Sequence, residues 1–524
     1  MIDPSSCELQ QKDWTRFFIE ADRFLEKTAE YVHRGVNPGG YYQAIWTRDA
    51  AFILKDQFLT GDTYNVLRSL HFIWAHQIGL NDEKIIYGRG SPELGFSVQY
   101  ADKKTKEKFS GALPSTIYYN QGFSEVYARN PDIDSTALMI STTSWILDVY
   151  LKAGLYSYYE SLPEWSSASS PPDPSSPPKS AARPLSSADY RRRQQDSHSD
   201  ALYKTGVPPL KVISKPVELI EFIVPRMLAA VEYLASRDID NDGLLEQGYN
   251  EDWMDTALRA GKIVYSQASW ILALSDLSSL LYEIGRKTTA ENLTEMAERT
   301  VSAVEEKLWS EKDGAYIDLK YNGAKNDKSD IDSNRERMLT QDISLYLVSI
   351  TENTLNDILS VRFKSENNGS DASHRSPAIG RRFDERKERQ DRIQPRVPRK
   401  IIEHRAASTL EAIKDRIWMD SAWPLVTEKE LDRTGPWLLD PNQYHNHTFW
   451  PWITGIEILA RSRFHRHGEC NELLSALTRA SHPQTLAYYE WVNPITGQGN
   501  GAFPFRTGIS TIRVALTDIL LSHT

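Results

Sequence analysis

The stretch Trp270-Ile-Leu-Ala-Leu-Ser-Asp-Leu-Ser-Ser-Leu-Leu-Tyr-Glu-Ile-Gly285 repeats its apolar side chains with the period of an α-helix. Spacings of four, three and four residues put four of them on one helix face: Trp270, Leu274, Leu277 and Leu281. Gly285 then follows as a stop signal. The stretch predicts a helix with one buried face.

The same pattern recurs along most of the chain. After Pro216, a favoured first helical residue, a similar stripe runs from Leu219 to Leu234, and another includes Ile512, Leu516 and Ile519. About twelve helical segments are expected by this periodicity, beginning near residues 15, 48, 63, 134, 216, 266, 288, 340, 406, 444, 468 and 508. They predict an all-α fold, an (α/α)6 barrel of six helical hairpins that spans residues 1–524 as a single domain. A helical solenoid would give a similar pattern, but no fixed repeat period is found.

Two stretches interrupt the helices and have the composition of disordered insertions. Residues 161–209 hold Ser/Pro clusters and three consecutive arginines, and residues 364–405 are polar and then strongly basic. Neither can bury enough apolar surface to offset the entropy lost on ordering. We expect two disordered loop insertions, with a basic interaction tail as the alternative for the second.

Composition narrows the class of partner. The chain has 524 residues, 40% of them hydrophobic, which suffices for a large core. Its net charge of −10 disfavours nucleic acid, because an acidic chain repels phosphate. The two cysteines, Cys7 and Cys470, cannot build a disulfide framework. Neither a signal peptide nor a membrane-spanning apolar run is found, so we expect a cytoplasmic protein without a membrane partner. The sequence does not determine the oligomeric state.

The loop Tyr41-Tyr-Gln-Ala-Ile-Trp-Thr-Arg-Asp-Ala50 places Arg48 beside Asp49. Neighbouring sugar hydroxyls need both donors and acceptors, which a guanidinium and a carboxylate supply. Trp46 adds an aromatic face for stacking on a sugar ring. The alternative interpretation is an Arg–Asp pair that caps a helix.

A second loop, from Asp238 to Asp255, is dense in carboxylates. Its opening Asp-x-Asp-x-Asp-Gly matches the start of a calcium loop, but the twelfth position falls on Tyr249, which offers no bidentate carboxylate. We therefore expect neither a metal nor a cofactor. Asp255 follows Trp253 and Met254, and apolar neighbours raise the pKa of a carboxyl group. A raised pKa suits a general acid.

Two loops near the C-terminus are also rich in aromatic residues. The stretch Tyr444-His-Asn-His-Thr-Phe-Trp-Pro-Trp-Ile-Thr-Gly455 predicts a stacking wall containing Trp450 and Trp452, with His447 bonded to a sugar hydroxyl. Its two histidines have no obvious third metal ligand. In Tyr489-Glu490-Trp491 the glutamate precedes a turn-rich stretch. Taken alone, Glu490 would be an exposed glutamate near a loop.

Together these loops resemble the six-hairpin glycosidases, especially the glucoamylase family (glycoside hydrolase family fifteen) and the amylo-α-1,6-glucosidase module of glycogen debranching enzymes. Residues 41–54 are similar to the glucoamylase segment Tyr-Tyr…Trp-Thr-Arg-Asp-Ser. Residues 251–255 are similar to the debranching-enzyme Thr-Trp-Met-Asp, whose last Asp is the general acid. Residues 446–455 resemble that family's His-x-Gly-Thr-Val-Trp-Pro-Trp, and residues 132–136 resemble its Val-Asp-Ala-Thr.

The resemblance implies a role for each candidate residue. Asp255 would be the general acid and Glu490 the general base, although the families place the base in a Ser-Glu-(aromatic or Leu)-Asp segment that this chain lacks. The expected sugar-binding residues are Trp46, Arg48, Asp49, Asp134, Trp253, His447, Trp450 and Trp452.

We therefore expect an inverting glycoside hydrolase that releases a sugar, with glucose as the expected product, from the non-reducing end of an α-glucoside or oligosaccharide. Such a hydrolase needs no cofactor. Two alternatives remain, because one fold hosts several functions. One is a phosphorylase or sugar epimerase on the same barrel, and the other is a non-catalytic carbohydrate-binding barrel.

Overall fold

A computed structural model of the chain describes residues 4–80, 83–152, 216–320, 338–351, 397–419, 423–431 and 439–522. The first predicted insertion, residues 161–209, lies outside these ranges. Of the second, residues 364–405, only 397–405 are described.

Six helices form a closed inner ring in which each packs against the next and the last packs against the first. In ring order they are α2 (Thr47–Leu59), α5 (Ile133–Lys152), α9 (Val264–Glu283), α11 (Ser344–Ser349), α15 (Pro451–Arg463) and α17 (Arg506–Ser522). The contact between α17 and α2 closes the ring. Contact between the first and last inner helices distinguishes a barrel from an open solenoid, so the predicted closure is confirmed.

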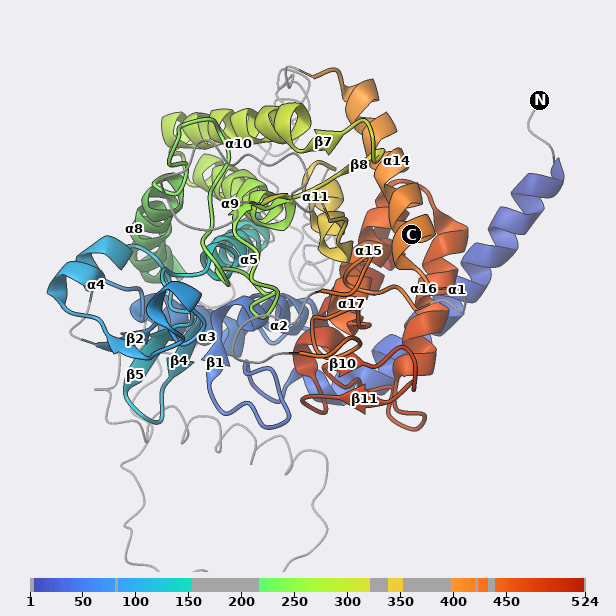
Figure 1. The fold of residues 1–524 in the computed structure, drawn as a ribbon, viewed down its shortest axis with the longest axis horizontal. Coiled ribbons are helices and arrows are strands. Elements are labelled where there is room, and N and C mark those ends of the chain that lie inside the picture. The colour runs from blue at the N-terminus through green and yellow to red at the C-terminus, as the bar shows by residue number, and fades with distance from the viewer. Residues whose placement is uncertain are drawn as a thin grey trace, which may run out of the picture.

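A second set of helices alternates with these along the chain and packs outside them (Figure 1). They are α1 (Pro4–Val32), α3 (Thr63–Ala75), α8 (Pro216–Ala235), α10 (Lys287–Lys307), α14 (Arg399–Ile417) and α16 (His467–Ala480). Each outer helix precedes an inner one, which gives six hairpins. The predicted (α/α)6 barrel is therefore the fold of this chain. A further short helix, α4 (Lys103–Phe109), lies between α3 and α5.

Burial differs between the two sets in the way the barrel requires. Helix α5 is buried from Ile133 to Tyr150 because neighbours surround it. Helix α16 buries one stripe, which includes Leu473 and Leu477, as an outer helix with one covered face does. The predicted stripe on α9 is also buried: Trp270, Leu274, Leu277 and Leu281.

Short strands lie in the loops between helices. One five-stranded sheet has the order β1-β4-β5-β2-β3, with bounds Ile45–Trp46, Thr116–Tyr118, Phe123–Val126, Lys84–Tyr87 and Gln99–Tyr100. Three antiparallel pairs are β6 (Gly261–Lys262) with β9 (Leu319–Lys320), β7 (Trp309–Ser310) with β8 (Ala315–Tyr316), and β10 (Trp491–Val492) with β11 (Gly499–Asn500). Two 3-10 turns, η1 (Pro92–Leu94) and η2 (Gln341–Ile343), complete the described elements.

Several predicted boundaries differ from the structure, and the first helix begins at Pro4 rather than near residue 15. The helix expected near residue 444 begins at Pro451, because Tyr444 and His447 adopt left-handed backbone conformations (φ 49° and 62°) that a helix excludes. The second predicted insertion ends too late, since α14 already begins at Arg399. Arg405 donates to the carboxylate of the buried Glu305 at 2.9 Å. The basic composition concealed the start of a helix, in which Arg399 pairs with Glu403 and Arg405 with Glu305.

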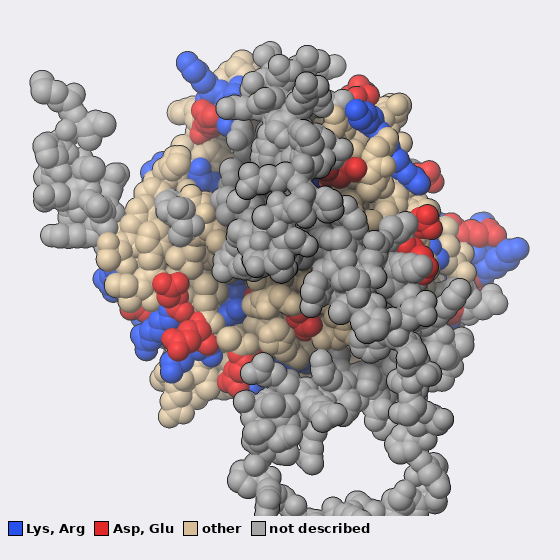
Figure 2. Space-filling view, turned by 180° about the vertical axis from the view of Figure 1, so that it is seen from behind, with Lys and Arg blue, Asp and Glu red and all other residues tan. Residues whose placement is uncertain are grey.

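Acidic and basic side chains are interspersed on the described surface that is visible in Figure 2. Such mixing of charge signs is typical of a solvated surface. Among the described residues, no helix is both long enough and apolar enough to span a bilayer.

Candidate active site

A cavity of about 210 Å³ opens where the loops before the inner helices converge. Since every inner helix follows an outer one, the inner helices run in the same direction and their N-termini meet at one end. The start of α2 contributes Arg48, the start of α15 contributes Trp452 and the start of α17 contributes Thr507. The acid loop, defined as residues 247–259, adds its carboxylates just before α9. The topology thus gathers loops that lie far apart in the sequence.

Most of the predicted site residues line this cavity. Those that do are Trp46, Arg48, Asp49, Trp253, Asp255, Trp450, Trp452 and Glu490. Two predicted sugar contacts, Asp134 and His447, are not among its lining residues.

Asp255 has few fixed partners. Its side chain is 27% exposed, and its Oδ1 atom lies 3.6 Å from His445 Nδ1. Among the described residues, Oδ1 is buried without a hydrogen-bond donor. Burial raises the pKa of Asp255 to about 7, opposed by Arg48 and reinforced by Glu490 and Asp252. A carboxyl group with this pKa holds its proton near neutral pH and can donate it.

Glu490, in contrast, is surrounded by donors. Oε1 accepts hydrogen bonds from the hydroxyls of Tyr42 (2.8 Å) and Tyr444 (3.1 Å). Oε2 accepts from the Tyr41 hydroxyl (3.2 Å) and the Ala502 backbone N–H (3.0 Å). Burial raises the pKa of Glu490, while these donors favour its charged form and lower the pKa.

The strand pair β10–β11 delivers Glu490 to the cavity. Gly501, at φ 77°, lies so close that a Cβ atom there would be 2.5 Å from Glu490 Oε2. Only glycine combines this backbone conformation with this approach. The turn-rich sequence after Glu490 therefore brings the Ala502 N–H within hydrogen-bond distance of the Glu490 carboxylate.

Arg48 and Asp49 lie side by side at the start of α2. The Arg48 guanidinium is 3.7 Å from Asp49 Oδ2 and 3.4 Å from Asp134 Oδ2. Asp49 also accepts from Thr507 Oγ1 at 2.7 Å, which connects α2 to α17. Asp134 is fully buried behind Arg48 and accepts from Tyr265. Asp134 therefore positions Arg48 rather than facing the cavity.

The histidine that lines the cavity is His445, not the predicted His447. His445 Nδ1 lies 2.9 Å from Thr256 Oγ1, and burial lowers the pKa of this imidazole, so it is neutral. His447 instead pairs with the Thr427 carbonyl at 2.9 Å. His447 has a left-handed backbone conformation, with φ 62°.

The tryptophans form a compact cluster. Trp253 packs edge-on against Trp450 and Trp452, with ring centroids 5.5 and 4.9 Å away. Trp450 and Trp452 are each 3% exposed, so most of their surface is used in packing. Trp450 and Trp452 therefore form the wall of the cavity but offer little open face for stacking. The Trp46 ring is more accessible.

Several lining residues escaped the sequence analysis. From the five-stranded sheet and its surroundings come Arg89, Tyr118, Glu125, Tyr127 and Asp132. Arg89 Nε lies 3.0 Å from Glu125 Oε1, and the Tyr118 hydroxyl donates to Glu125 Oε2 at 3.0 Å. Asp132 opens the recognised segment 132–136, but no motif marks the other four; Tyr118 and Glu125 lie on strands of only three and four residues. Tyr42 lies within the recognised motif of residues 41–54, so the sequence did offer a signal for it.

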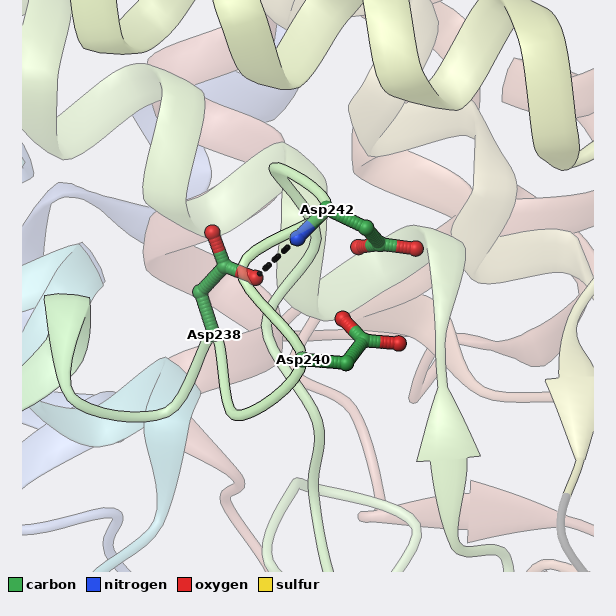
Figure 3. A group of neighbouring side chains, drawn as sticks. All are labelled: Asp238, Asp240 and Asp242. Carbon is green, nitrogen blue, oxygen red and sulfur yellow. Dashed lines mark hydrogen bonds between the residues drawn. The ribbon is translucent and has the colours of Figure 1, made fainter.

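The acidic turn at the start of the second loop, residues 238–242, is paired with basic side chains of the same chain. Figure 3 shows the carboxylates of Asp240 and Asp242 on one side of this turn and Asp238 accepting a hydrogen bond from the Asp242 backbone N–H; one oxygen of each lies within 4.8 Å of the others, close enough for a metal ion. The buried Lys262 ammonium lies 2.6 Å from Asp240 and 2.5 Å from Asp242. Arg299 and Lys307 pair with Asp238 and Asp242. Basic side chains therefore neutralise these carboxylates, none of which lines the cavity.

No family model and no curated protein matches this chain. Among solved structures it is similar to an uncharacterized conserved protein from Thermus thermophilus, with 15% identity, 95% of this chain and 99% of that chain covered, and a TM-score of 0.47. A GH63 mannosylglycerate hydrolase from the same organism, in complex with glucose, has 14% identity, 96% and 99% coverage and a TM-score of 0.47. A wild-type glycosidase has 10% identity, 96% and 98% coverage and a TM-score of 0.47. At these identities and scores, the similarity assigns no activity to this chain.

Proposed function

We propose that this chain is an inverting glycoside hydrolase that releases a sugar, with glucose as the expected product, from the non-reducing end of an α-glucoside or oligosaccharide. One observation carries the proposal: Asp255 and Glu490 line the same cavity in opposite environments. Asp255 Oδ1 has no hydrogen-bond donor among the described residues, whereas Glu490 has four. Paired carboxyl groups with contrasting environments identify an acid and a base.

In the proposed reaction, Asp255 transfers its proton to the glycosidic oxygen as the bond from that oxygen to the anomeric carbon breaks. Glu490 removes a proton from a water molecule that attacks the anomeric carbon on the opposite face. The products are the released sugar and the alcohol of the leaving group, with Asp255 charged and Glu490 protonated. A proton exchange with solvent restores both groups.

Arg48 and Asp49 supply the polar contacts for the terminal sugar in this proposal. A guanidinium donor beside a carboxylate acceptor can bind two neighbouring hydroxyls. The carboxylate is fixed by Thr507, and the guanidinium by Asp134. Groups held by a second set of contacts lose less freedom when the sugar binds.

The volume of the cavity favours a small substrate portion. About 210 Å³ is less than the roughly 300–1,000 Å³ typical of sites for drug-sized ligands. Such a cavity suits one terminal sugar rather than the middle of a polysaccharide. This agrees with release from a chain end, and the expected cytoplasmic location is part of the same proposal.

A hydrolysis screen tests the proposal directly. Maltose, isomaltose, trehalose, sucrose and a mannosyl series are incubated with the protein and with Asp255→Asn, in the presence and absence of phosphate. We expect phosphate-independent release of a monosaccharide by the unsubstituted protein only. Strict phosphate dependence would instead identify a phosphorylase, a new sugar without hydrolysis an epimerase, and binding without any product a carbohydrate-binding barrel.

A further inference from the structure

The acid loop is fastened to the barrel by a closed set of hydrogen bonds. Asp342 Oδ2 accepts from Trp253 Nε1 at 2.7 Å and from Arg259 Nη2 at 2.6 Å. Arg259 Nε in turn donates to Asp252 Oδ2 at 2.7 Å. Asp252 and Trp253 are neighbours in the chain, so the circuit closes. All four side chains are buried.

The circuit encloses the segment that carries Asp255. Asp252 and Trp253 precede Asp255 by three and two residues, and Arg259 follows it by four. Asp342 belongs to η2, which leads into the inner helix α11. A single carboxylate from another hairpin thus holds both sides of the short segment from 252 to 259.

Asp255 itself has little that would fix it. Its Oδ1 atom has no donor among the described residues, and His445 Nδ1 is 3.6 Å away. Glu490, by comparison, is held by four direct hydrogen bonds. With so few direct contacts, the placement of the Asp255 carboxyl group depends on the backbone on either side of it.

We propose that Asp342, acting through Trp253 and Arg259, is a positioning residue for the Asp255 carboxyl group. The inference rests on the proposed role of Asp255 as general acid. Asp342 does not line the cavity, so it does not touch the substrate. Charge-assisted hydrogen bonds are about twice as strong as neutral ones, and a misplacement of about 1 Å can lower a rate about 10²-fold.

The substitution Asp342→Asn weakens the circuit without removing its shape. Arg259 keeps two other carboxylates, Asp252 at 2.7 Å and Asp318 at 3.5 Å, so its charge stays paired in the variant. Asp318→Asn is the matched control. Asp318 is also buried and also faces Arg259, but it is not the partner of Trp253 Nε1.

Two substrates with the same sugar separate positioning of the acid from general damage. An α-glucosyl fluoride has a leaving group that needs little protonation, whereas an unactivated α-glucoside needs the acid. For Asp342→Asn we expect kcat/KM to fall about tenfold or more on the glucoside and less than about twofold on the fluoride. Asp318→Asn should lower kcat/KM by the same factor on both substrates. Weaker sugar binding or partial unfolding would also lower kcat/KM equally on the two substrates.

Equal losses of Asp342→Asn on the two substrates, or no loss on either, would overturn the inference. If this variant does not fold, Trp253→Phe removes the indole N–H while keeping an aromatic ring, and the same comparison applies to it. Asp255→Asn is measured alongside as the reference. If Asp255→Asn shows no difference between the substrates, the proposed acid itself is wrong; if it does and Asp342→Asn does not, only the positioning role fails.

Discussion

Tyr42 and Glu490 lie 448 residues apart in the sequence, yet the Tyr42 hydroxyl donates a hydrogen bond of 2.8 Å to the Glu490 carboxylate. The contact joins the loop before α2 to the strand pair before α17, across the seam where the first and last hairpins meet. The proposed base therefore has a hydrogen-bond partner that only closure of the ring brings to it.

Replacing Tyr42 by phenylalanine should shift the low-pH limb of the activity profile to higher pH. The Tyr42 hydrogen bond favours charged Glu490 and lowers its pKa. Without it, Glu490 becomes protonated at a higher pH and activity is lost earlier on acidification. The dependence of kcat/KM on pH measures this shift. Tyr41→Phe is the control, because Tyr41 is 62% exposed and its bond is longer, at 3.2 Å; we expect a smaller effect, and equal shifts would contradict this prediction.

Asp255→Asn should lower turnover of an unactivated glycoside by about 10² or more, which is the range for loss of a general acid. The high-pH limb of the profile should vanish in the variant, because the pKa of Asp255, about 7, is what defines it. Steady-state kinetics from pH 5 to 9 test both statements. Near-normal rates in the variant would show that another group donates the proton.

The same substitution should stabilise the protein above neutral pH. The pKa of Asp255 is about 7 in the folded state, against an ordinary value of 3.8. The folded state therefore binds more protons, and its stability falls as the pH rises from about 4 to about 7. At about 1.4 kcal/mol per pKa unit, the loss is on the order of a few kcal/mol. Asparagine stays neutral at every pH, so the variant does not lose this stability.

Thermal unfolding of both proteins from pH 4 to pH 8 measures this effect. The melting temperature of Asp255→Asn should match that of the unsubstituted protein near pH 4 and exceed it increasingly up to pH 7. If the difference in melting temperature between the two proteins does not change with pH, the charge on Asp255 does not cause it. Asp238→Asn, outside the cavity, serves as the control.

Hydrolysis of an α-glucoside should release the β-anomer first. An inverting enzyme must fit a water molecule between base and sugar, which requires roughly 6.5–9.5 Å between the two carboxyl groups, against about 5–5.5 Å in a retaining enzyme. We predict the wider separation for Asp255 and Glu490. NMR of the product before mutarotation reads the stereochemistry, and the α-anomer as first product would falsify the pairing of these residues.

The basic segment before α14 should be removable only up to its described boundary. The composition of residues 364–396 offers almost nothing to a core, and loop length has little effect on stability, so a short Gly/Ser linker in its place should preserve the melting temperature. Extending the deletion to Arg405 removes the start of α14 and the bonds from Arg405 to Glu305. We expect this longer deletion to lower the melting temperature clearly. Differential scanning calorimetry compares the two, and equal stabilities would refute the assigned boundary.

Much of the fold could be predicted from the sequence, because helices are specified locally. The stripe from Trp270 to Leu281 needs only the period of its apolar residues, and it is buried as expected. Segments with left-handed residues, such as Tyr444 and His447, break this local rule. The helix start was therefore placed too early there, and His445 rather than the predicted His447 lines the cavity.

The motifs alone pointed to Asp255, Arg48 and Asp49 as candidate residues, since each lies beside distinctive neighbours in the chain. The tertiary structure decided what surrounds them. Asp134 is turned behind Arg48, three tyrosines gather on Glu490, and Asp342 reaches the acid loop from another hairpin. The reason is physical: periodicity records which face of a helix is buried, but a cavity forms only where closing the ring brings the inner N-termini together. Distances, partners and pKa values at that end depend on contacts between distant segments, which local sequence does not encode.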